Sequence, residues 1–315
     1  MMKKMLGNML TIGIGAVVLT GCGDFEEELE ILTGGEQGAY YPLGGQLSDV
    51  INNEVDDWDA AHFATSASVV NINDLADDDG DLALTQNDTA YYAVNGEVDF
   101  EEPVEGFSGM ASLYPEVIQI VATDASGIET VDDMEGMDVA VGDAGSGTEV
   151  VSEQLLEAHG ITYDDIGVEY QDFEDAADGL QDENIDAAIM VAGAPTGAIE
   201  ALSAQQDITL VDVEEEVGNE LIDEYPYFSE YELEEGLYDN EEAVDTLTVQ
   251  AMLVAHDELD DDTVYEILEV MFDNTESFEN AHESGSHIDL ETAQEGMSID
   301  LHPGAEQFYE DQGVE

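Results

Sequence analysis

The distribution of charge constrains this chain more than any other feature of its sequence. Asp and Glu together number 79, whereas Lys and Arg number two, and both are lysines, Lys3 and Lys4. A fold built from the rest of the chain therefore contains no Lys or Arg ion pair. Nothing in it can neutralise a row of phosphates, which argues against nucleic-acid binding and against peripheral contact with anionic lipid.

Salt is needed to make such a composition compatible with a compact fold. Carboxylates that repel one another destabilise the folded state, and at molar salt the screening length falls to about 3 Å. We therefore expect a halophilic protein exposed to brine, in which almost every acidic residue is solvated surface. The chain is nevertheless 43% apolar, so it can bury a real core.

Residues 1–21 have the pattern of a secretion signal. Two lysines precede the mostly apolar stretch Met5–Leu19, which is too short to span a membrane as a helix. The sequence Leu19-Thr20-Gly21-Cys22 resembles the processing box of lipoproteins, so Cys22, the only cysteine, is the expected lipidation site. An uncleaved anchor helix is the alternative. Either reading predicts an extracytoplasmic protein anchored to the outer face of the cell membrane, with residues 22–28 as an acidic linker.

Strand and helix patterns alternate along the rest of the chain, which predicts an α/β fold with mostly parallel sheets. Expected strands are 29–33, 62–65, 81–85, 110–113, 117–123, 139–141, 168–170, 185–191, 208–213 and 246–255. Helices are expected between them, including a short one at 128–134, and again at 262–274 and at the chain end. Because no flexible linker divides the 315 residues, we expect two domains that are interleaved in sequence.

Residues 138–160 carry the most informative local pattern. Gly142, Gly145 and Gly147 follow a short apolar strand and are expected to adopt positive φ, and Ser146 or Thr148 is expected to cap the helix that follows. Backbone N–H groups at the start of such a helix suit a carboxylate or another small anion. The alternative is that the glycines serve turn geometry alone. Loops 34–41, 65–68, 85–88 and 192–196 also follow strands, where α/β sheets bind ligands.

Six segments, in this order, resemble the TAXI family of solute receptors, which are extracytoplasmic binding proteins of TRAP transporters. They are Gly34–Gly44, Gln86-Asn87-Asp88, Leu113-Tyr114-Pro115-Glu116, Val141–Glu149, Ala192-Gly193-Ala194-Pro195-Thr196 and Leu301-His302-Pro303-Gly304-Ala305. The resemblance covers about residues 29–313. One departure is Thr65-Ser66-Ala67-Ser68, where the family tends to have Thr-Gly-Gly-Ser.

The resemblance implies a two-lobed type II periplasmic-binding-protein fold. Lobe one would comprise 29–121 plus 247–315 and lobe two 122–246, with 117–123 and 246–255 crossing between them. The protein would not be an enzyme. As an expected monomer, it would capture a small carboxylate or amino acid, glutamate-like, and deliver it to a TRAP-type permease driven by an ion gradient.

The ligand-binding residues that we expect come from loop position and from this resemblance. Tyr40 and Tyr114 line the pocket wall or are packing residues, and Ser66 donates to the solute. Asn87 and Asp88 bind an ammonium or hydroxyl group, or cap a helix. The carboxylate would be held by Gly145, Ser146, Gly147 and Thr148, and the lobe-two wall would be shaped by Gly193, Pro195 and Thr196. No metal and no cofactor are expected, and an arginine clamp on the solute is impossible.

Two other functions are compatible with parts of the sequence. A secreted hydrolase is disfavoured because Gly145-Ser146-Gly147 lacks the spacing of a nucleophile elbow, and the six histidines form no zinc motif. A receptor for an ABC importer, or a sensor, would share the fold and most of the same loops. The sequence does not decide between these binding proteins, and it does not name the solute.

Overall fold

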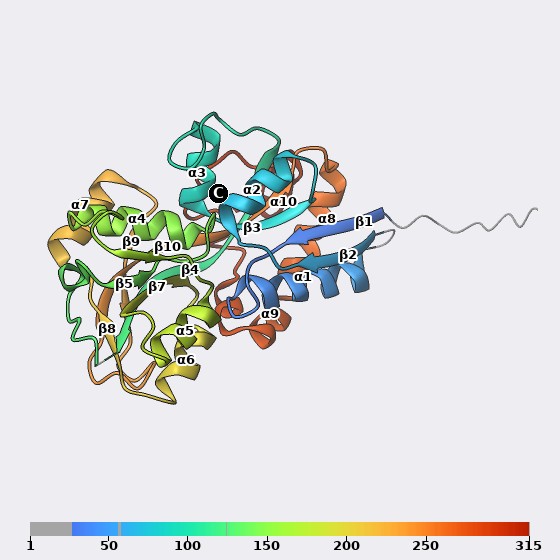
Figure 1. Cartoon of the computed structure of the whole chain (residues 1–315). Coiled ribbons are helices and arrows are strands. Elements are labelled where there is room, and N and C mark those ends of the chain that lie inside the picture. The colour runs from blue at the N-terminus through green and yellow to red at the C-terminus, as the bar shows by residue number, and fades with distance from the viewer. Residues whose placement is uncertain (1–26, 56–57, 124, 315) are drawn as a thin grey trace, which may run out of the picture.

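The computed structural model describes residues 27–55, 58–123 and 125–314 (Figure 1). The expected signal peptide and the lipidation site Cys22 lie outside the described residues. Residues 27 and 28, assigned above to the linker, are the first two of strand β1 (Glu27–Leu32). Among the helices of the described ranges, none is both long enough and apolar enough to cross a membrane.

The described strands form one mixed sheet of ten strands, ordered β2-β1-β3-β10-β4-β7-β5-β6, with β8 paired to β4 and β9 to β10. One group of elements contains β1, β2 (Trp58–Phe63) and β3 (Leu82–Gln86) with helices α1 (Tyr40–Glu54), α2 (Ser68–Ala76) and α3 (Asn87–Asn95). The other contains β5 (Asp138–Ala140), β6 (Gly167–Glu169), β7 (Ala187–Ala192) and β8 (Ile208–Val211) with α4 (Gly147–Ala158), α5 (Phe173–Gln181), α6 (Gly197–Ser203) and α7 (Glu215–Glu224).

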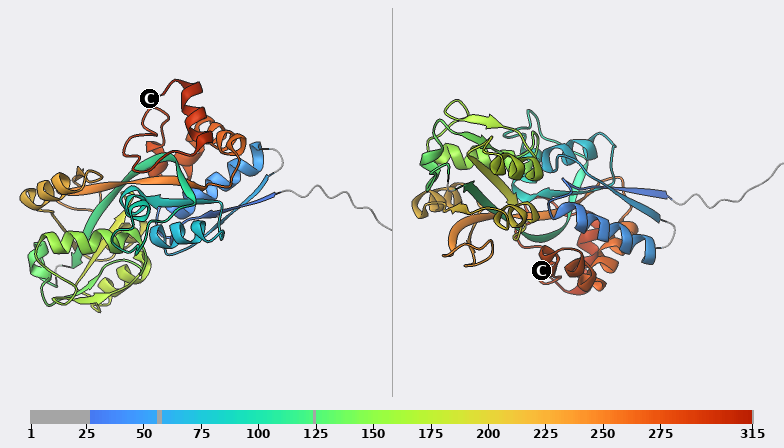
Figure 2. Two further views of the ribbon diagram at one scale, coloured as in Figure 1. Left: turned by 90° about the horizontal axis from the view of Figure 1, so that it is seen from above. Right: turned by 60° about the horizontal axis from the view of Figure 1, so that its bottom comes forward.

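Two long antiparallel strands join these groups, as Figures 1 and 2 show. They are β4 (Phe107–Thr123) and β10 (Val244–His256). In β4, residues 107–117 pair with β10, residues 117–122 pair with β7, and residues 120–123 pair with β8. Strand β10 in turn pairs with β3 through its second half and with β9 (Ser229–Leu233) through its first half. The division of the chain into two lobes, with the boundaries given above, stays a prediction.

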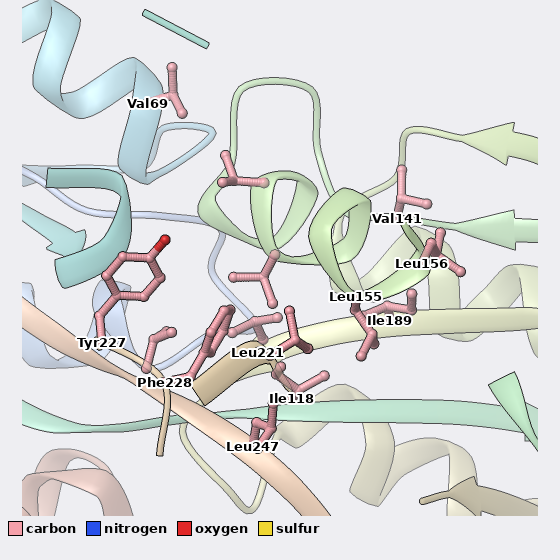
Figure 3. Packing of buried hydrophobic residues seen from close by; sticks show 14 of the residues in the cluster. Val69, Ile118, Val141, Leu155, Leu156, Ile189, Leu221, Tyr227, Phe228 and Leu247 are labelled. Carbon is pink, nitrogen blue, oxygen red and sulfur yellow. The ribbon is translucent and has the colours of Figure 1, made fainter. Parts of the chain in front are cut away.

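The last segment of the chain returns to the first group. Helices α8 (Asp261–Asp273), α9 (Thr275–Ala281) and α10 (Pro303–Gln312) pack with α1 around an apolar cluster that includes Leu43, Leu268 and Phe308. A second cluster lies on the other side of the sheet, under α2, α3, α4 and α7. Figure 3 shows part of it, with Val69, Ile118, Leu155 and Tyr227 among its members. Because this cluster draws on both groups, it also packs them against each other.

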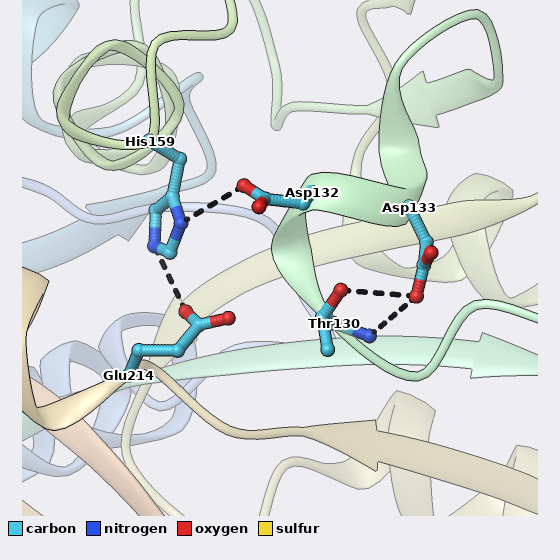
Figure 4. A network of polar contacts seen from close by, with 5 residues as sticks. All are labelled: Thr130, Asp132, Asp133, His159 and Glu214. Carbon is cyan, nitrogen blue, oxygen red and sulfur yellow. Dashed lines mark hydrogen bonds and ion pairs between the residues drawn. The ribbon is translucent and has the colours of Figure 1, made fainter.

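Histidine is the basic residue in each contact between basic and acidic side chains found among the described residues. His159, whose side chain is 3% exposed, lies 3.6 Å from Asp132 and 3.3 Å from Glu214 (Figure 4). These contacts join the end of α4 to the short 3-10 helix η1 (Val131–Met134) and to the residue before α7. Only the histidine of this contact is buried: the Asp132 and Glu214 side chains are 75% and 41% exposed, in line with the expected surface position of most carboxylates.

Several expectations about individual elements were wrong. Residues 110–113 and 117–123 belong to one strand, β4, because Pro115 interrupts the ladder without ending it: its partner Gln250 gives its N–H to the Asn87 side chain, at 3.0 Å. The sheet has five antiparallel pairings and four parallel ones, since β4 and β10 run against their neighbours. The short helix expected at 128–134 is only η1, and β2 ends at Phe63 instead of extending to Thr65. Strand β9 and helix α9 were not expected.

Asn71 in α2 ties together the strand ends that border the space between the groups. Its Nδ2 donates to the carbonyls of Thr33 and Leu84, at 2.6 and 2.7 Å, and its Oδ1 accepts from the Thr65 hydroxyl at 2.5 Å. The side chain is 0% exposed. Removing it would take one donor away from each of these two carbonyl groups and an acceptor away from the Thr65 hydroxyl.

We predict that Asn71→Ala lowers the free energy of unfolding by about 2 to 4 kcal/mol, because several buried polar groups lose their partner together. Urea unfolding in molar salt measures the change. Asn73→Ala is the matched control on the same helix: Asn73 is exposed and bonds only to the Val69 carbonyl, so its effect should stay below about 0.5 kcal/mol. Equal effects of the two variants would contradict the structural role of Asn71.

Candidate functional site

A buried cleft lies between the two groups of elements, beside the crossing strand β4. Its cavity volume is about 70 Å³, enough for roughly five to seven water molecules, so it suits a small solute. One wall comes from the loop before α1, the loop before α2 and the end of β3, and the other from the loops before α4 and α5 and the end of β7. The lining residues are Gly34, Gly35, Gly38, Ala39, Tyr40, Thr65, Ser66, Ala67, Ser68, Gln86, Glu116, Asp143, Ser146, Gly147, Thr148, Asp172, Phe173, Val191 and Ala192.

The start of α4 forms one side of the cleft. Ser146 is the N-cap, and its Oγ accepts the N–H of Glu149 at 3.1 Å, while the Glu149 carboxylate accepts the N–H of Gly145 at 2.6 Å. Gly147 and Thr148 open the helix, where no preceding turn offers carbonyl partners to their N–H groups. Gly142 and Gly145 have φ of 98° and 79° as expected, but Gly147 is already helical.

The start of α2 forms the facing side. Neither Ser66 nor Ser68 caps this helix: the N-cap is Ala67, and the Ser68 hydroxyl accepts the N–H of Gln86 at 3.1 Å. Ala67 itself adopts φ 68°, a conformation that usually selects glycine. The loop therefore makes its turn despite lacking the glycines found in the TAXI pattern. The Val70 N–H donates to the Gly145 carbonyl at 3.3 Å and so links the two walls directly.

Glu116 lies in the part of the cleft formed by β4 and is 4% exposed. Tyr40 Oη donates to one carboxylate oxygen at 2.9 Å, and Tyr114 Oη donates to the other at 3.3 Å. Burial raises the pKa of Glu116 to about 8, and the nearby Asp88 adds to the rise, while hydrogen bonds from Gln86 and the two tyrosines oppose it. At neutral pH the empty cleft therefore holds Glu116 largely in its neutral form.

Two further acceptors lie close to Glu116 without a hydrogen-bond partner among the described residues. Gln86 Oε1 is one, on a side chain that lines the cleft and is 2% exposed. Asp88 Oδ2 is the other. Burial raises the pKa of Asp88 to about 7, whereas hydrogen bonds to backbone N–H groups and to the Thr89 hydroxyl oppose the rise. When Glu116 and Asp88 are ionised, the acceptors of this region therefore outnumber the donors that the described residues supply.

The structure brings together five of the predicted site residues: Tyr40, Ser66, Ser146, Gly147 and Thr148 all line the cleft. Gly145 lies at its edge, where a β-carbon would approach Val70 to 3.1 Å. Asp88 is buried behind the lining. The Thr148 hydroxyl points to the Val191 carbonyl at 3.4 Å, so its N–H is the group best placed to meet a solute.

The other predicted residues lie apart from the lining. Asn87 and Tyr114 border a second, polar cavity of about 330 Å³ between β4, β10 and the C-terminal segment. The Asn87 side chain caps no helix: it accepts from the Gln250 N–H and donates to the Gly296 carbonyl. Thr196 bonds to Gln119 and Tyr238, and a β-carbon on Gly193 would meet Ser284 and Tyr114. Pro195, in a cis peptide bond, borders the same loop.

The sequence reasoning missed Glu116, Gln86, Thr65, Asp143, Asp172 and Phe173 as lining residues. The signal for Glu116 and Gln86 was present, because both belong to segments that resemble the receptor family. Glu116 was passed over because the composition makes any single carboxylate look like solvated surface. Phe173 reaches across the cleft, where a β-carbon on Gly38 would lie 3.5 Å from its ring.

One group of residues has the composition of a metal site: Asp78, His256 and Glu258 place ligand atoms within 4.8 Å of one another, away from the cleft lining. Both ring nitrogens of His256 already have partners. Nε2 lies 3.1 Å from the Asp78 carboxylate, and Nδ1 accepts the Glu258 N–H at 3.2 Å. A metal on either nitrogen would displace one of these contacts, so we interpret the group as a hydrogen-bonded contact of His256 that fixes the end of β10.

Known proteins resemble the chain over almost its whole length. The model of the NMT1-like family matches residues 31–313. Similar solved structures include the periplasmic aliphatic sulphonate binding protein SsuA from Escherichia coli (16% identity, 90% of this chain and 83% of that chain, TM-score 0.51). They also include a binding protein component of an ABC phosphonate transporter from Pseudomonas aeruginosa (13%, 84% and 80%, 0.51) and a putative L-cystine ABC transporter from Listeria monocytogenes (12%, 84% and 98%, 0.53). These similarities confirm the predicted α/β, type II periplasmic-binding-protein fold.

The raised pKa of Glu116 predicts a pH dependence of stability. A carboxyl with a pKa of about 8 when folded and 4.5 as its ordinary value keeps its proton in the folded chain after the unfolded chain has lost it. Its contribution to stability is therefore complete below pH 4.5 and is lost as the pH rises to about 8. In Glu116→Gln, the fall in unfolding free energy between pH 5 and pH 8 should be shallower than in the wild type.

Urea unfolding at constant molar salt, repeated across this pH range, measures the difference. Glu266→Gln serves as the control because Glu266 is exposed on α8 and the substitution removes the same charge. That variant should keep the slope of the wild type. Parallel curves for Glu116→Gln and the wild type would show that Glu116 does not change its proton affinity on folding.

Proposed function

This chain belongs to the NMT1-like family, and from that premise we propose that it is an extracytoplasmic receptor for a small carboxylate or amino acid. The solute would be held between the two groups of elements that β4 and β10 join. Cys22 would carry a lipid that anchors the receptor to the outer face of the cell membrane. The similar structures are named as an aliphatic sulphonate binding protein, a binding protein component of an ABC phosphonate transporter and a putative L-cystine ABC transporter.

The observation that carries this proposal is the convergence of three helix starts on one small cleft. The residues at the beginnings of α1, α2 and α4 all line it, from both sides of the crossing strands. A helix start offers unpartnered N–H groups and the positive end of the helix dipole. In a chain without Lys or Arg beyond residue 4, these are the groups available to hold an acid.

The proposal also concerns the type of transporter that receives the solute. The sequence motifs resemble those of TRAP receptors, but two of the similar structures are named as parts of ABC transporters. We therefore favour an ABC importer over the TRAP permease expected above. Solute uptake by membrane vesicles from the source cells should then require ATP, whereas uptake driven by an imposed sodium gradient without ATP would favour the TRAP permease.

A receptor also explains Ser146 better than a hydrolase would. Its Oγ accepts the N–H of Glu149 as the cap of α4, which is a structural use of the hydroxyl. The cleft carboxyl Glu116 bonds to two tyrosines and not to Ser146. Binding without turnover is the simplest use of this arrangement.

We predict that Gly147→Ala abolishes solute binding while the protein still folds. A β-carbon at this position would lie 2.1 Å from Gln86 Oε1 and 2.9 Å from the Ser68 hydroxyl, so the two walls could not approach as closely. Binding is measured by the thermal unfolding midpoint in about 3 M salt, with a panel of amino acids, dicarboxylates and betaines. A solute at 100 times its dissociation constant adds roughly 2.7 kcal/mol of stability.

Gly197→Ala is the matched control. Gly197 likewise opens a helix, α6, but a β-carbon there would meet nothing closer than 3.9 Å. This variant should keep the solute-induced shift of the wild type. Retention of the shift in Gly147→Ala would place the solute elsewhere, and a folded wild type that responds to no solute of the panel would contradict the receptor function.

A further inference from the structure

We propose that the solute carries a protonated amine and that Glu116, together with Gln86, receives it. The inference rests on the receptor function proposed above and narrows the solute from a small carboxylate or amino acid to one that bears an ammonium group. It concerns the side of the cleft that presents hydrogen-bond acceptors, whereas the helix starts present donors.

The acceptor side is built from buried side chains. Glu116 and Gln86 are 4% and 2% exposed, both line the cleft, and Gln86 Oε1 has no hydrogen-bond partner among the described residues. A buried acceptor without a donor costs free energy unless a ligand or water supplies one. The Gln86 backbone N–H is bonded to the Ser68 hydroxyl, which fixes this residue at the wall.

When Glu116 is ionised, its carboxylate has no counterion among the described residues. Its direct partners are two tyrosine hydroxyls, which stabilise a carboxylate but bring no positive charge. Every other ionisable group known to act on it, Asp88 included, is acidic or neutral. Because the sequence contains no Lys or Arg after residue 4 and no histidine acts on Glu116, a positive charge next to it has to come from outside the chain. An ammonium group offers that charge and three N–H donors.

The opposite wall requires the solute to carry an acid as well. Gly147 and Thr148 present helix-start N–H groups, and Gly147 lies so close to Gln86 that the two subsites face each other across the narrow cleft. A solute with an ammonium and a carboxylate close together matches both walls. A dianionic solute would instead bring a negative group up to Glu116, Asp143 and Asp172.

Proton release should accompany binding of such a solute. The groups that face Glu116 are Tyr40 from α1, Gln86 from the end of β3, Asp88 from α3 and Tyr114 from β4 itself. In the empty cleft they leave the pKa of Glu116 at about 8, whereas an adjacent ammonium favours the ionised form. Affinity for the amine should therefore rise with pH up to about 8, by as much as tenfold per unit.

Matched pairs of solutes test the inference on the purified full-length chain. Each amino acid of the panel is compared with the acid that lacks only its amine: alanine with propionate, glutamate with glutarate, and so on. Titration calorimetry in about 3 M salt should show binding of an amino acid at least tenfold tighter than that of its partner acid. Equal or tighter binding of the partner acid would overturn the amine subsite and leave the receptor function standing. Binding of neither class would contradict the receptor function itself.

A variant separates Glu116 from the rest of the cleft. Glu116→Gln should weaken binding of the amino acid at least tenfold and remove the rise of affinity between pH 6 and pH 8. Glu266→Gln, which removes an exposed charge on α8, should change neither. Unfolding midpoints show whether both variants are folded. A folded Glu116→Gln protein with unchanged affinity and an unchanged pH profile would overturn the assignment of the amine to Glu116.

Discussion

The structure depends on one constraint: beyond residue 4 the chain has no lysine or arginine that could pair with its many carboxylates. Most carboxylates stay in water. Those that are buried or half-buried find other partners: Glu149 accepts a backbone N–H, and Glu116 is surrounded by hydroxyls and retains its proton. Each arrangement avoids a buried unpaired charge, which would be very costly. In the cleft the described residues do not provide a partner for every buried polar group, so a ligand can provide the missing partners.

The two crossing strands, β4 and β10, place the cleft between the two groups of elements. Along β4, residues 107–117 pair with β10 and residues 117–122 pair with β7. Glu116 therefore lies where the strand passes from one group of elements to the other. Helix starts from both groups then face the same carboxyl. The two walls also touch directly, through the hydrogen bond from Val70 to Gly145 and the packing of Phe173 on Gly38.

The sequence predicted the elements whose patterns are local and left out those that depend on tertiary partners. The central strand, glycine loop and capped helix were foreseen in detail, because Gly142, Gly145 and Ser146 act through backbone conformation and capping. Pro115 was read as a break between two strands, since nothing local shows that Asn87 will take the N–H left unpaired opposite it. Ala67 adopts positive φ where the family pattern would have glycine, and local propensity gives no sign of it. Glu116 was hidden among 79 acidic residues, and only its burial distinguishes it.

A crystal structure of the protein grown with a solute that raises its unfolding midpoint would test the central claim most directly. We predict that the solute lies in the cleft, with its acid group at the N–H groups of Gly147 and Thr148 and its amine beside Glu116. The second cavity, bordered by Asn87 and Tyr114, is larger and more polar, and a solute found there with the cleft empty would contradict the assignment of the site.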